Sequence, residues 1–332
     1  MKVMQLEQYA AIGTSPLVAR KLPMPVPGPG EIRVRVRCCG ICRTDLHVIE
    51  GELAPSRLPI VPGHQIVGIV DALGAGATRF ETGTRVGIAW LRSTCGFCEY
   101  CRSGRENLCE AARFTGYHEH GGFAEYALVN ESFAYRIPEA FSDTAAAPLL
   151  CAGIIGYRAL RRANLSPKGM LLLYGFGSSA HIVIQLALSR GSQVMVITRG
   201  DKHRELAQSM GAVWVGQTSK DLPEKADSAI IFAPAGELVP DALESLKKGG
   251  TLSLAGIHLS EVPKLNYSRH LFFEKNIHSV TANTRQDGEE LLAEAARIPI
   301  IPYTTTYRLQ DANLALQDLS QDKIRGSGVL VI

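Results

Sequence analysis

The chain lacks long hydrophobic runs: no stretch among its 332 residues reaches the ~18 uninterrupted apolar residues that cross a membrane. Its opening, Met1-Lys-Val-Met-Gln5, has no apolar signal core. Charge of one sign is also scarce, because the formal net charge is only +3 and the basic residues are scattered. No 20- to 50-residue repeat is visible. We therefore expect a cytoplasmic globular protein without a membrane or nucleic-acid partner.

The chain length and the change of residue pattern along it predict two domains of roughly 150 residues each. In the first half, apolar residues alternate with arginines through residues 32–38, which is the period of a strand with one buried face. Further strand-like segments, 65–72 and 123–129, are separated by glycine-containing turns. This half is predicted to be mainly β.

The pattern of apolar and turn residues changes near residue 150. We expect a helix over 143–160, and the apolar run Met170–Tyr174 is typical of a strand buried on both faces. Strands and helices then alternate: predicted strands are 193–197, 212–215, 228–233 and 251–255, and predicted helices are 182–189, 203–210 and 239–246. This alternation predicts an α/β domain with a doubly wound parallel sheet.

Four closely spaced cysteines form the clearest motif, and they are Cys95, Cys98, Cys101 and Cys109. Two-residue gaps let successive turns of a loop point their sulfurs at one tetrahedral zinc ion. Disulfides are the alternative, but no signal segment sends the chain to an oxidising compartment. A zinc site closed by four cysteines holds a loop and does no chemistry, so the activity must lie elsewhere.

A glycine-rich turn, Gly175-Phe-Gly177-Ser178-Ser-Ala180, directly follows the apolar strand and opens a helix. In dinucleotide-binding folds the first glycine permits the tight turn, the second lets the backbone approach a pyrophosphate, and the third position must be small. The alternative is a turn without a ligand. We interpret the motif as a dinucleotide site.

The end of the next strand predicts which coenzyme is bound. An NAD enzyme usually carries Asp or Glu there, but this chain has Thr198-Arg199-Gly200. Arg199 can form charge-assisted bonds with a 2′-phosphate, and Lys202 and Arg204 add positive charge nearby. We therefore predict NADP(H). The alternative is that these cations form a solvated helix face and that NAD(H) serves equally well or better.

Three short motifs remain: Cys42 to His47, Pro62-Gly63-His64, and Leu150-Cys151-Ala152. Each alone could be a core cysteine or a turn histidine. In this order, beside the cysteine motif and the nucleotide turn, they make the whole chain to Ile332 resemble the zinc-dependent alcohol dehydrogenases of the medium-chain dehydrogenase/reductase family, in their yeast-type or cinnamyl-type branch. The resemblance implies two zinc ions per chain, a catalytic one on Cys42, His64 and Cys151 and a structural one on the four cysteines.

The resemblance also implies roles for further residues. Asp45 aligns with a carboxylate that orients the histidine ligand, Thr44 and His47 with a proton relay, and Arg325 with a contact to the coenzyme pyrophosphate. It implies a glycine-rich, GroES-like catalytic domain over 1–152 and 282–332, a Rossmann domain over 153–281, and a cleft holding the catalytic zinc and the nicotinamide. A homo-oligomer, dimer or tetramer, is expected.

In such a family, zinc stabilises the alkoxide of a bound alcohol, because it lowers the alcohol's pKa as it lowers that of water, to about 7. Trp90, just before the cysteine motif, resembles a tryptophan that narrows the substrate pocket in the yeast-type branch. We therefore expect a primary alcohol and aldehyde pair as substrates. The alternative for Trp90 is simple packing at a strand end. Alternative functions are a cinnamyl-type reductase of aromatic aldehydes and a non-catalytic zinc-binding protein.

Three positions depart from the family pattern. Gln65 replaces the glutamate that usually follows the histidine ligand, and an amide oxygen is a poorer zinc ligand than a carboxylate. Ile155 stands where many relatives carry a threonine near the nicotinamide. Ala180 replaces the third glycine of the turn, which costs little because the position needs only a small side chain.

Overall fold

The computed structural model describes residues 1–55, 57–298 and 300–332. The chain divides into two compact units. Unit 1 comprises 1–152, 283–297 and 301–332, and unit 2 comprises 153–282 and 298–300. Among the described residues, no helix combines the length and apolarity that a membrane crossing requires.

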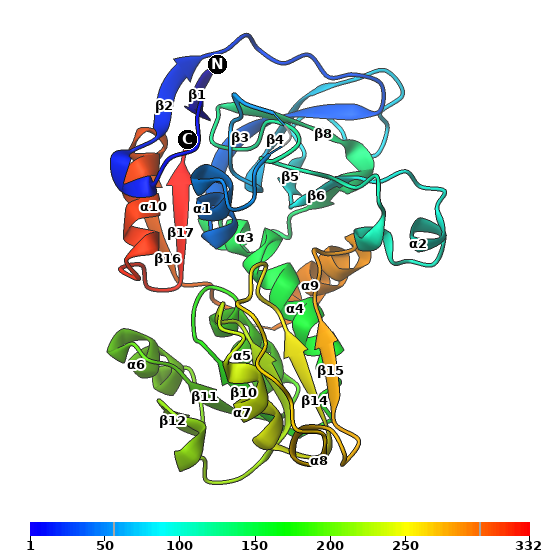
Figure 1. Ribbon diagram of the computed structural model, residues 1–332. Helices are drawn as coiled ribbons and strands as arrows, with labels where there is room; N and C mark the ends of the chain where they lie inside the picture. Colours follow the sequence, from blue (N-terminus) through cyan, green and yellow to red (C-terminus); the bar gives the residue numbers. More distant parts are fainter. Residues whose placement is uncertain (56, 299) are drawn as a thin grey trace. The chain divides into compact units, whose positions relative to one another are not determined.

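Unit 1 is built on a seven-stranded, mainly antiparallel sheet with the order β16-β17-β3-β4-β5-β9, in which β8 also pairs with β3 (Figure 1). Its strands are β3 (Glu31–Ile41), β4 (Gln65–Leu73), β5 (Arg85–Ile88), β8 (Tyr126–Asn130), β9 (Ala134–Arg136), β16 (Thr304–Arg308) and β17 (Ser327–Val331). In β3 the apolar residues Ile32, Val34 and Val36 are buried, as the alternation predicts.

Shorter elements surround this sheet. Two-stranded sheets are formed by β1 (Lys2–Leu6) with β2 (Leu17–Lys21), and by β6 (Leu91–Ser93) with β7 (Arg113–Phe114). The helices of unit 1 are α1 (Arg43–Glu50), α2 (Glu99–Arg102), α3 (Asp143–Ala146), α9 (Arg285–Arg297) and α10 (Ala312–Ser320), with 3-10 helices η1 (Ile12–Thr14), η2 (Glu106–Leu108), η3 (Glu131–Phe133), η4 (Ala147–Leu150) and η6 (Leu309–Asp311).

The predicted continuous helix over 143–160 is wrong. The chain instead forms α3, then η4, and resumes as α4 (Ala152–Arg162). Pro148 lies at the start of η4 and cannot donate the backbone hydrogen bond that a continuous helix would need. Cys151 then departs from helical geometry, with φ −136° and ψ −71°. The break lets its side chain leave the helix surface.

Unit 2 contains a six-stranded parallel sheet with the order β12-β11-β10-β13-β14-β15, which is the 3-2-1-4-5-6 order of a Rossmann fold. Its strands are β10 (Met170–Tyr174), β11 (Gln193–Ile197), β12 (Trp214–Gly216), β13 (Ala226–Ile231), β14 (Leu246–Leu254) and β15 (Asn276–Ser279). Its other elements are α5 (Ala180–Ser189), α6 (Asp201–Ser209), α7 (Leu238–Glu244), α8 (Tyr267–His270) and the 3-10 helix η5 (Ser219–Asp221). The predicted doubly wound α/β fold is confirmed.

Each unit has its own hydrophobic core. In unit 1 it gathers residues of β3, β4 and α10, such as Ile32, Ile66 and Leu316. In unit 2 it lies on the parallel sheet, where Leu172, Met195 and Ala229 are completely buried. β10 is buried along its whole length, as its continuous apolar run predicts.

Candidate metal and dinucleotide sites

Cys42, His64 and Cys151 converge within unit 1. The Cys42 Sγ lies 3.4 Å from His64 Nε2 and 4.0 Å from Cys151 Sγ. Cys42 ends the turn between β3 and α1, His64 directly precedes β4, and Cys151 occupies the break between η4 and α4. Three ligands on separate elements, with His64 fully buried, form an incomplete tetrahedral set, as in catalytic zinc sites.

Asp45 holds the histidine of this set. Its Oδ1 lies 3.2 Å from His64 Nδ1, and its Oδ2 accepts a 2.9 Å hydrogen bond from the backbone N–H of Cys42. The second bond is part of a capping box at the start of α1. One carboxylate therefore links two of the three candidate ligands and directs Nε2 of His64 toward the sulfurs.

The electrostatics of the three-ligand set favour a positive charge at its centre. A hydrogen bond from Cys151 and the charge of His64 hold the pKa of Cys42 well below its ordinary value despite burial. Burial opposes protonation of His64, but Asp45 and Cys42 outweigh it and raise the pKa of the imidazole to about 10. A cation placed between these groups would displace the His64 and Cys151 protons and take over their electrostatic role.

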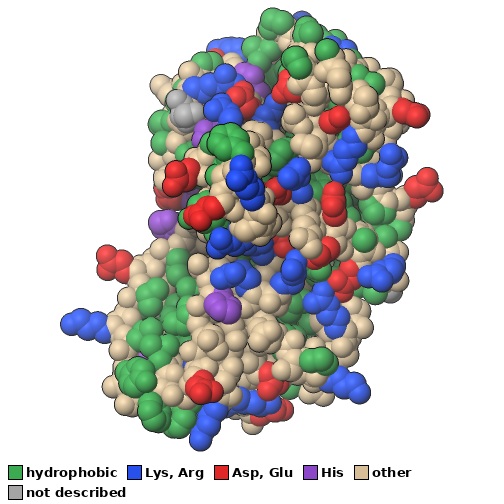
Figure 2. All heavy atoms as spheres, turned by 90° about the vertical axis from the view of Figure 1, so that its right-hand side faces the viewer, with side chains coloured by type: hydrophobic (Ala, Val, Ile, Leu, Met, Phe, Trp, Pro, Cys, Tyr) green, Lys and Arg blue, Asp and Glu red, His purple; other side chains and the backbone are tan. Residues whose placement is uncertain are grey.

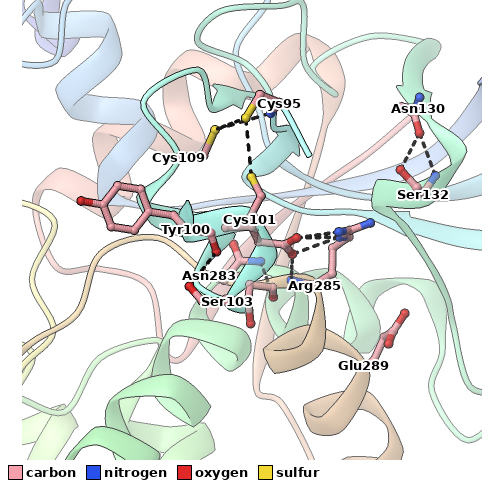
Figure 3. A network of polar contacts seen from close by, with 12 residues as sticks. Cys95, Tyr100, Cys101, Ser103, Cys109, Asn130, Ser132, Asn283, Arg285 and Glu289 are labelled. Atoms are coloured by element: carbon pink, nitrogen blue, oxygen red, sulfur yellow. Dashed lines mark hydrogen bonds and ion pairs between the residues drawn. The ribbon is translucent and has the colours of Figure 1, made fainter. Parts of the chain in front are cut away.

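The four cysteines of the motif also converge in unit 1, as Figure 3 shows for Cys95, Cys101 and Cys109. Sulfur separations are 3.9 Å for Cys95–Cys101, 3.5 Å for Cys98–Cys101 and 3.6 Å for Cys95–Cys109. Four sulfurs at about 2.3 Å from one ion at tetrahedral angles lie about 3.8 Å apart. The cysteines are not disulfide-bonded, and their spacing fits zinc.

Backbone N–H groups support the sulfur of Cys95, since the amide of Cys98 donates to it at 3.3 Å. Such bonds, from Phe97 and Cys98, lower the pKa of Cys95 to about 6. These bonds favour the thiolate form of Cys95, which is the form that binds a metal. With four sulfur donors the set is closed, unlike the three-ligand set.

Trp90 lies beside the three-ligand set. Its ring meets His64 edge-on at 4.9 Å between centroids, stacks on Phe114 at 5.0 Å and lies 5.8 Å from Tyr117. Only 9% of Trp90 is exposed. The indole therefore packs against a candidate metal ligand, a contact that fits both a pocket wall and simple packing.

The glycine-rich turn in unit 2 leaves room for a ligand. Gly175 has φ +87°, and a Cβ there would lie 3.3 Å from the backbone N of Ala233. A Cβ on Gly177 would meet no protein atom within 4 Å. Ser178 follows, and Ala180 begins α5 and is completely buried. An open approach at Gly177 before a helix N-terminus is the arrangement that binds a pyrophosphate.

At the end of β11, Thr198 is buried and Arg199 is exposed. No hydrogen bond or ion pair within the described part of the chain engages the Arg199 guanidinium, although its charge is felt by Glu237. Arg204 donates instead to the backbone oxygen of Arg199 at 2.7 Å and pairs with Asp201. The guanidinium of Arg199 can therefore form hydrogen bonds with an anion, whereas that of Arg204 stabilises the turn.

The remaining predicted residues occupy scattered positions. Arg325 is exposed, and its guanidinium lies 5.3 Å from the centre of the Tyr303 ring. Gln65 is buried, and within the described chain its Nε2 has no hydrogen-bond partner. Ile155 is half-buried in α4. Thr44 is buried in α1 and contributes a hydrogen bond to Cys42.

Sequence reasoning missed Glu52. Its carboxylate contacts Nδ1 of His47, the predicted relay histidine at the C-terminal end of α1. The spacing of five residues is not a helical neighbour distance, so no periodicity argument finds this pair. Gly51 is the available signal in the sequence, because a glycine often marks the reversal of the chain at the end of a helix.

A zinc-binding motif and a Rossmann fold in one chain indicate the class of the protein: a zinc- and nicotinamide-dependent oxidoreductase. Family models agree, since residues 28–139 match the alcohol dehydrogenase GroES-like domain and residues 180–297 match the zinc-binding dehydrogenase domain. The predicted GroES-like and Rossmann combination is confirmed.

A Mycobacterium tuberculosis (strain CDC 1551 / Oshkosh) protein named "Probable alcohol dehydrogenase AdhA" is 51% identical over 299 residues, covering 89% of this chain and 86% of the relative. The chain belongs to the zinc-dependent alcohol dehydrogenase family of medium-chain dehydrogenases/reductases, as the resemblance predicted.

Two solved structures bear on the coenzyme. Acetophenone reductase from Geotrichum candidum, in complex with NAD, has 26% identity and a TM-score of 0.89, covering 100% of this chain and 97% of its own. A Sinorhizobium meliloti 1021 protein bound to NADP has 26% identity and a TM-score of 0.86, covering 100% and 99%. Equally similar folds thus carry either coenzyme, so the choice depends on local residues.

Proposed function

We propose that this enzyme interconverts a primary alcohol and its aldehyde with NADP(H), using a catalytic zinc on Cys42, His64 and Cys151 and a structural zinc on the four cysteines of the motif. The observation that carries the proposal is the three-ligand set around the buried His64, separate from a closed four-sulfur set. A non-catalytic zinc protein would need only the second.

The residues of the chain then divide the work. Zinc in the three-ligand set would lower the pKa of an alcohol and polarise a carbonyl, and the coenzyme would accept or supply the hydride. Asp45 fixes the orientation of His64. Thr44 and His47, both on α1, would pass the alcohol proton toward solvent, a task suited to a hydroxyl and an imidazole.

In unit 2, the turn from Gly175 to Ala180, including Ser178, would bind the pyrophosphate through backbone N–H groups at the start of α5. Thr198 and Arg199 would bind the 2′-phosphate, since Arg199 is exposed and no carboxylate of the described residues forms a hydrogen bond with its guanidinium. Arg325, on a turn of unit 1, would add a pyrophosphate contact. We assign the catalytic role to unit 1 and nucleotide binding to unit 2.

The substrate class rests on Trp90, whose indole would limit space near His64. A cinnamyl-type reductase is the second candidate, because stacked aromatic rings such as Trp90 and Phe114 can also hold a conjugated aldehyde. Relative rates with acetaldehyde, benzaldehyde and cinnamaldehyde separate the two.

We also propose a homo-oligomer. In unit 2, β15 is an edge strand, and close to it in sequence lie three exposed aromatic residues, Tyr267, Phe272 and Phe273. Hydrophobic side chains gather in the lower part of the face shown in Figure 2. Exposed apolar surface beside an edge strand favours association with another chain. Light scattering of the purified protein tests this.

The central experiment compares initial rates of NADPH and NADH oxidation with benzaldehyde as substrate. We expect a clear NADPH advantage in the wild-type enzyme and its reversal in Arg199→Asp. Lys220→Asp is the matched control, since it makes a similar charge change at an exposed residue of η5, which has no assigned coenzyme contact. An unchanged NADPH to NADH ratio in Arg199→Asp contradicts the coenzyme assignment, and no rate with any aldehyde contradicts the proposed activity.

A further inference from the structure

The turn of residues 116–121 has no part in the site assigned above, yet it lies against the backbone that leads to His64. Gly116 has φ +73°, and a Cβ on it would lie 2.9 Å from the backbone nitrogen of Gly63. A Cβ on Gly121 would lie 2.0 Å from the backbone oxygen of Gly63. Only glycine allows two backbones to approach so closely, so the turn is fixed beside the proposed zinc ligand.

Three side chains of this turn bind the stretch of chain between α1 and β4. The Tyr117 hydroxyl donates to the backbone oxygen of Ala54 at 2.9 Å, the Arg57 guanidinium donates to Glu119 at 3.1 Å, and the backbone N–H of Val61 donates to Nδ1 of His120 at 3.1 Å. Of these contacts, the first is made to residues 51–55, which directly follow α1.

The 51–55 segment borders the proposed catalytic site where it leaves α1. That helix carries His47, and the backbone N–H of Leu53 donates to the backbone oxygen of His47 at 2.9 Å. At the other end of the segment, the hydroxyl of Tyr9 donates to the backbone oxygen of Pro55 at 3.2 Å. Two tyrosine hydroxyls therefore hold the far end of the segment, and α1 holds the near end.

The ring of Tyr117 has different neighbours from its hydroxyl. It lies 5.8 Å from the ring of Trp90 and meets His118 edge-on at 4.5 Å between centroids, which forms an aromatic cluster of these three residues. Trp90 in turn meets His64 edge-on. Because Tyr117 is half-buried, with its ring in the cluster, its side chain links the wall beside the proposed catalytic zinc to the 51–55 segment.

We propose that Tyr117 determines which sizes of alcohol the enzyme accepts: its hydroxyl holds the 51–55 segment to the aromatic cluster and so narrows the space for substrate beside the proposed catalytic zinc. Tyr117 is a positioning residue, because it acts through the segment and not on the reacting atoms. A pocket that loses a fixed wall admits larger substrates and holds small ones less precisely. This inference rests on the proposed function, because it requires the alcohol to bind at the three-ligand set.

The test uses one conservative variant and one control. Tyr117→Phe keeps the ring and removes only the hydroxyl. Tyr126→Phe is the matched control, since it removes the hydroxyl of another half-buried tyrosine, whose ring on β8 lies 5.6 Å from the Arg33 guanidinium. Zinc content and thermal midpoints of both variants establish that they are folded.

The first measurement is kcat/KM for ethanol and for 3-methylbutan-1-ol, with the coenzyme that the wild-type enzyme uses faster. We expect Tyr117→Phe to raise the ratio of the bulky to the small alcohol about fivefold, the factor to which one typical hydrogen bond corresponds, and Tyr126→Phe to leave it within about twofold of wild type. An unchanged ratio in Tyr117→Phe overturns the proposal. A wild-type enzyme that is inactive with every primary alcohol would overturn the proposed function, and this inference with it.

The second measurement follows the segment itself, without substrate. Arg57 lies two positions beyond the segment, its side chain is 48% exposed, and trypsin cleaves after arginine. Proteolysis of a folded protein tracks the population of its opened form, so cleavage after Arg57, followed by mass spectrometry, should be faster in Tyr117→Phe than in wild type and Tyr126→Phe. Faster cleavage with an unchanged alcohol ratio would leave the hydroxyl a structural contact, and a changed ratio without faster cleavage would exclude action through the segment. Either result overturns the proposal.

Discussion

The guanidinium of Arg285 donates hydrogen bonds to both carboxylate oxygens of Glu106, although the two residues lie 179 positions apart. The backbone N–H of Arg285 adds a fourth bond at 2.8 Å. Glu106 begins η2, between the third and fourth cysteines of the zinc motif, and Arg285 begins α9, so the pair ties the motif to that helix (Figure 3). Burial opposes ionisation of Glu106, but the bonds from Arg285 outweigh it and lower the pKa of the carboxyl.

We predict that Glu106→Gln lowers the free energy of unfolding by about 1–2 kcal/mol, because it replaces charge-assisted bonds at a carboxylate that is mostly enclosed while Arg285 is partly solvated. Urea unfolding followed by circular dichroism measures the change. Glu289→Gln is the control, since Glu289 pairs with Arg79 at the surface. A Glu106 variant as stable as the Glu289 variant would contradict the prediction.

Metal content should separate the two cysteine sets. We expect two zinc ions per chain in the wild-type protein and one in both Cys151→Ser and Cys101→Ser, measured by elemental analysis. Cys151→Ser should lower kcat/KM by about 10³-fold or more, because it disables the metal's contribution of several kcal/mol to the reaction, while the fold persists. Cys101→Ser should mainly lower the thermal midpoint. Cys38→Ala, at a buried cysteine outside both sets, should keep two zinc ions.

Trp90→Ala should shift substrate preference toward bulky and secondary alcohols. The variant removes an indole that packs against His64, so we expect kcat/KM for these alcohols to rise relative to that for a small primary alcohol. Trp90→Phe keeps a ring that can stack on Phe114, so its substrate preference should lie between those of the wild-type enzyme and Trp90→Ala. Equal losses for all alcohols, together with reduced stability, would assign Trp90 to packing alone.

The buried His181 of unit 2 should make the free energy of unfolding depend on pH. Burial lowers the pKa of its imidazole to about 4 in the folded chain. Between about pH 6.5 and 4, the unfolded chain therefore binds a proton that the folded chain does not. This contribution is absent above about pH 6.5, and it reduces the free energy of unfolding by up to ~3 kcal/mol as the pH falls to about 4.

The difference between wild-type and His181→Gln stability curves isolates that contribution. The two curves should run parallel above pH 7 and converge or cross below pH 6. His258→Gln, at an exposed histidine, is the control. Curves for His181→Gln that stay parallel to wild type down to pH 4 would rule the effect out.

Local spacing explains what could be predicted from the sequence. The four cysteines lie within 15 residues, and the strand, glycine turn and helix from Met170 to Ser189 are contiguous, so both motifs are legible without tertiary information. The parallel sheet follows from the alternation of apolar strands and helices. The break at Cys151 does not follow from composition, because alanine- and leucine-rich sequence favours helix, and Pro148 is also compatible with the first turn of a helix.

Contacts that depend on tertiary packing or on the conformation of one turn could not be predicted from the sequence. The Glu106–Arg285 pair depends on how α9 packs against the rest of unit 1, and the Trp90–His64 contact depends on the approach of two loops. The Glu52–His47 contact depends on backbone dihedral angles at Gly51. Each is a property of the assembled chain and leaves no periodic trace in the sequence.

The edge-on contact between Trp90 and His64 has a consequence for how such an enzyme can diversify. A substitution at residue 90 that changes the proposed substrate pocket would also alter the packing of the imidazole that we propose as a ligand of the catalytic zinc. At this position a change of substrate range is therefore coupled to metal binding. Relatives that lack the indole should carry compensating substitutions around the histidine.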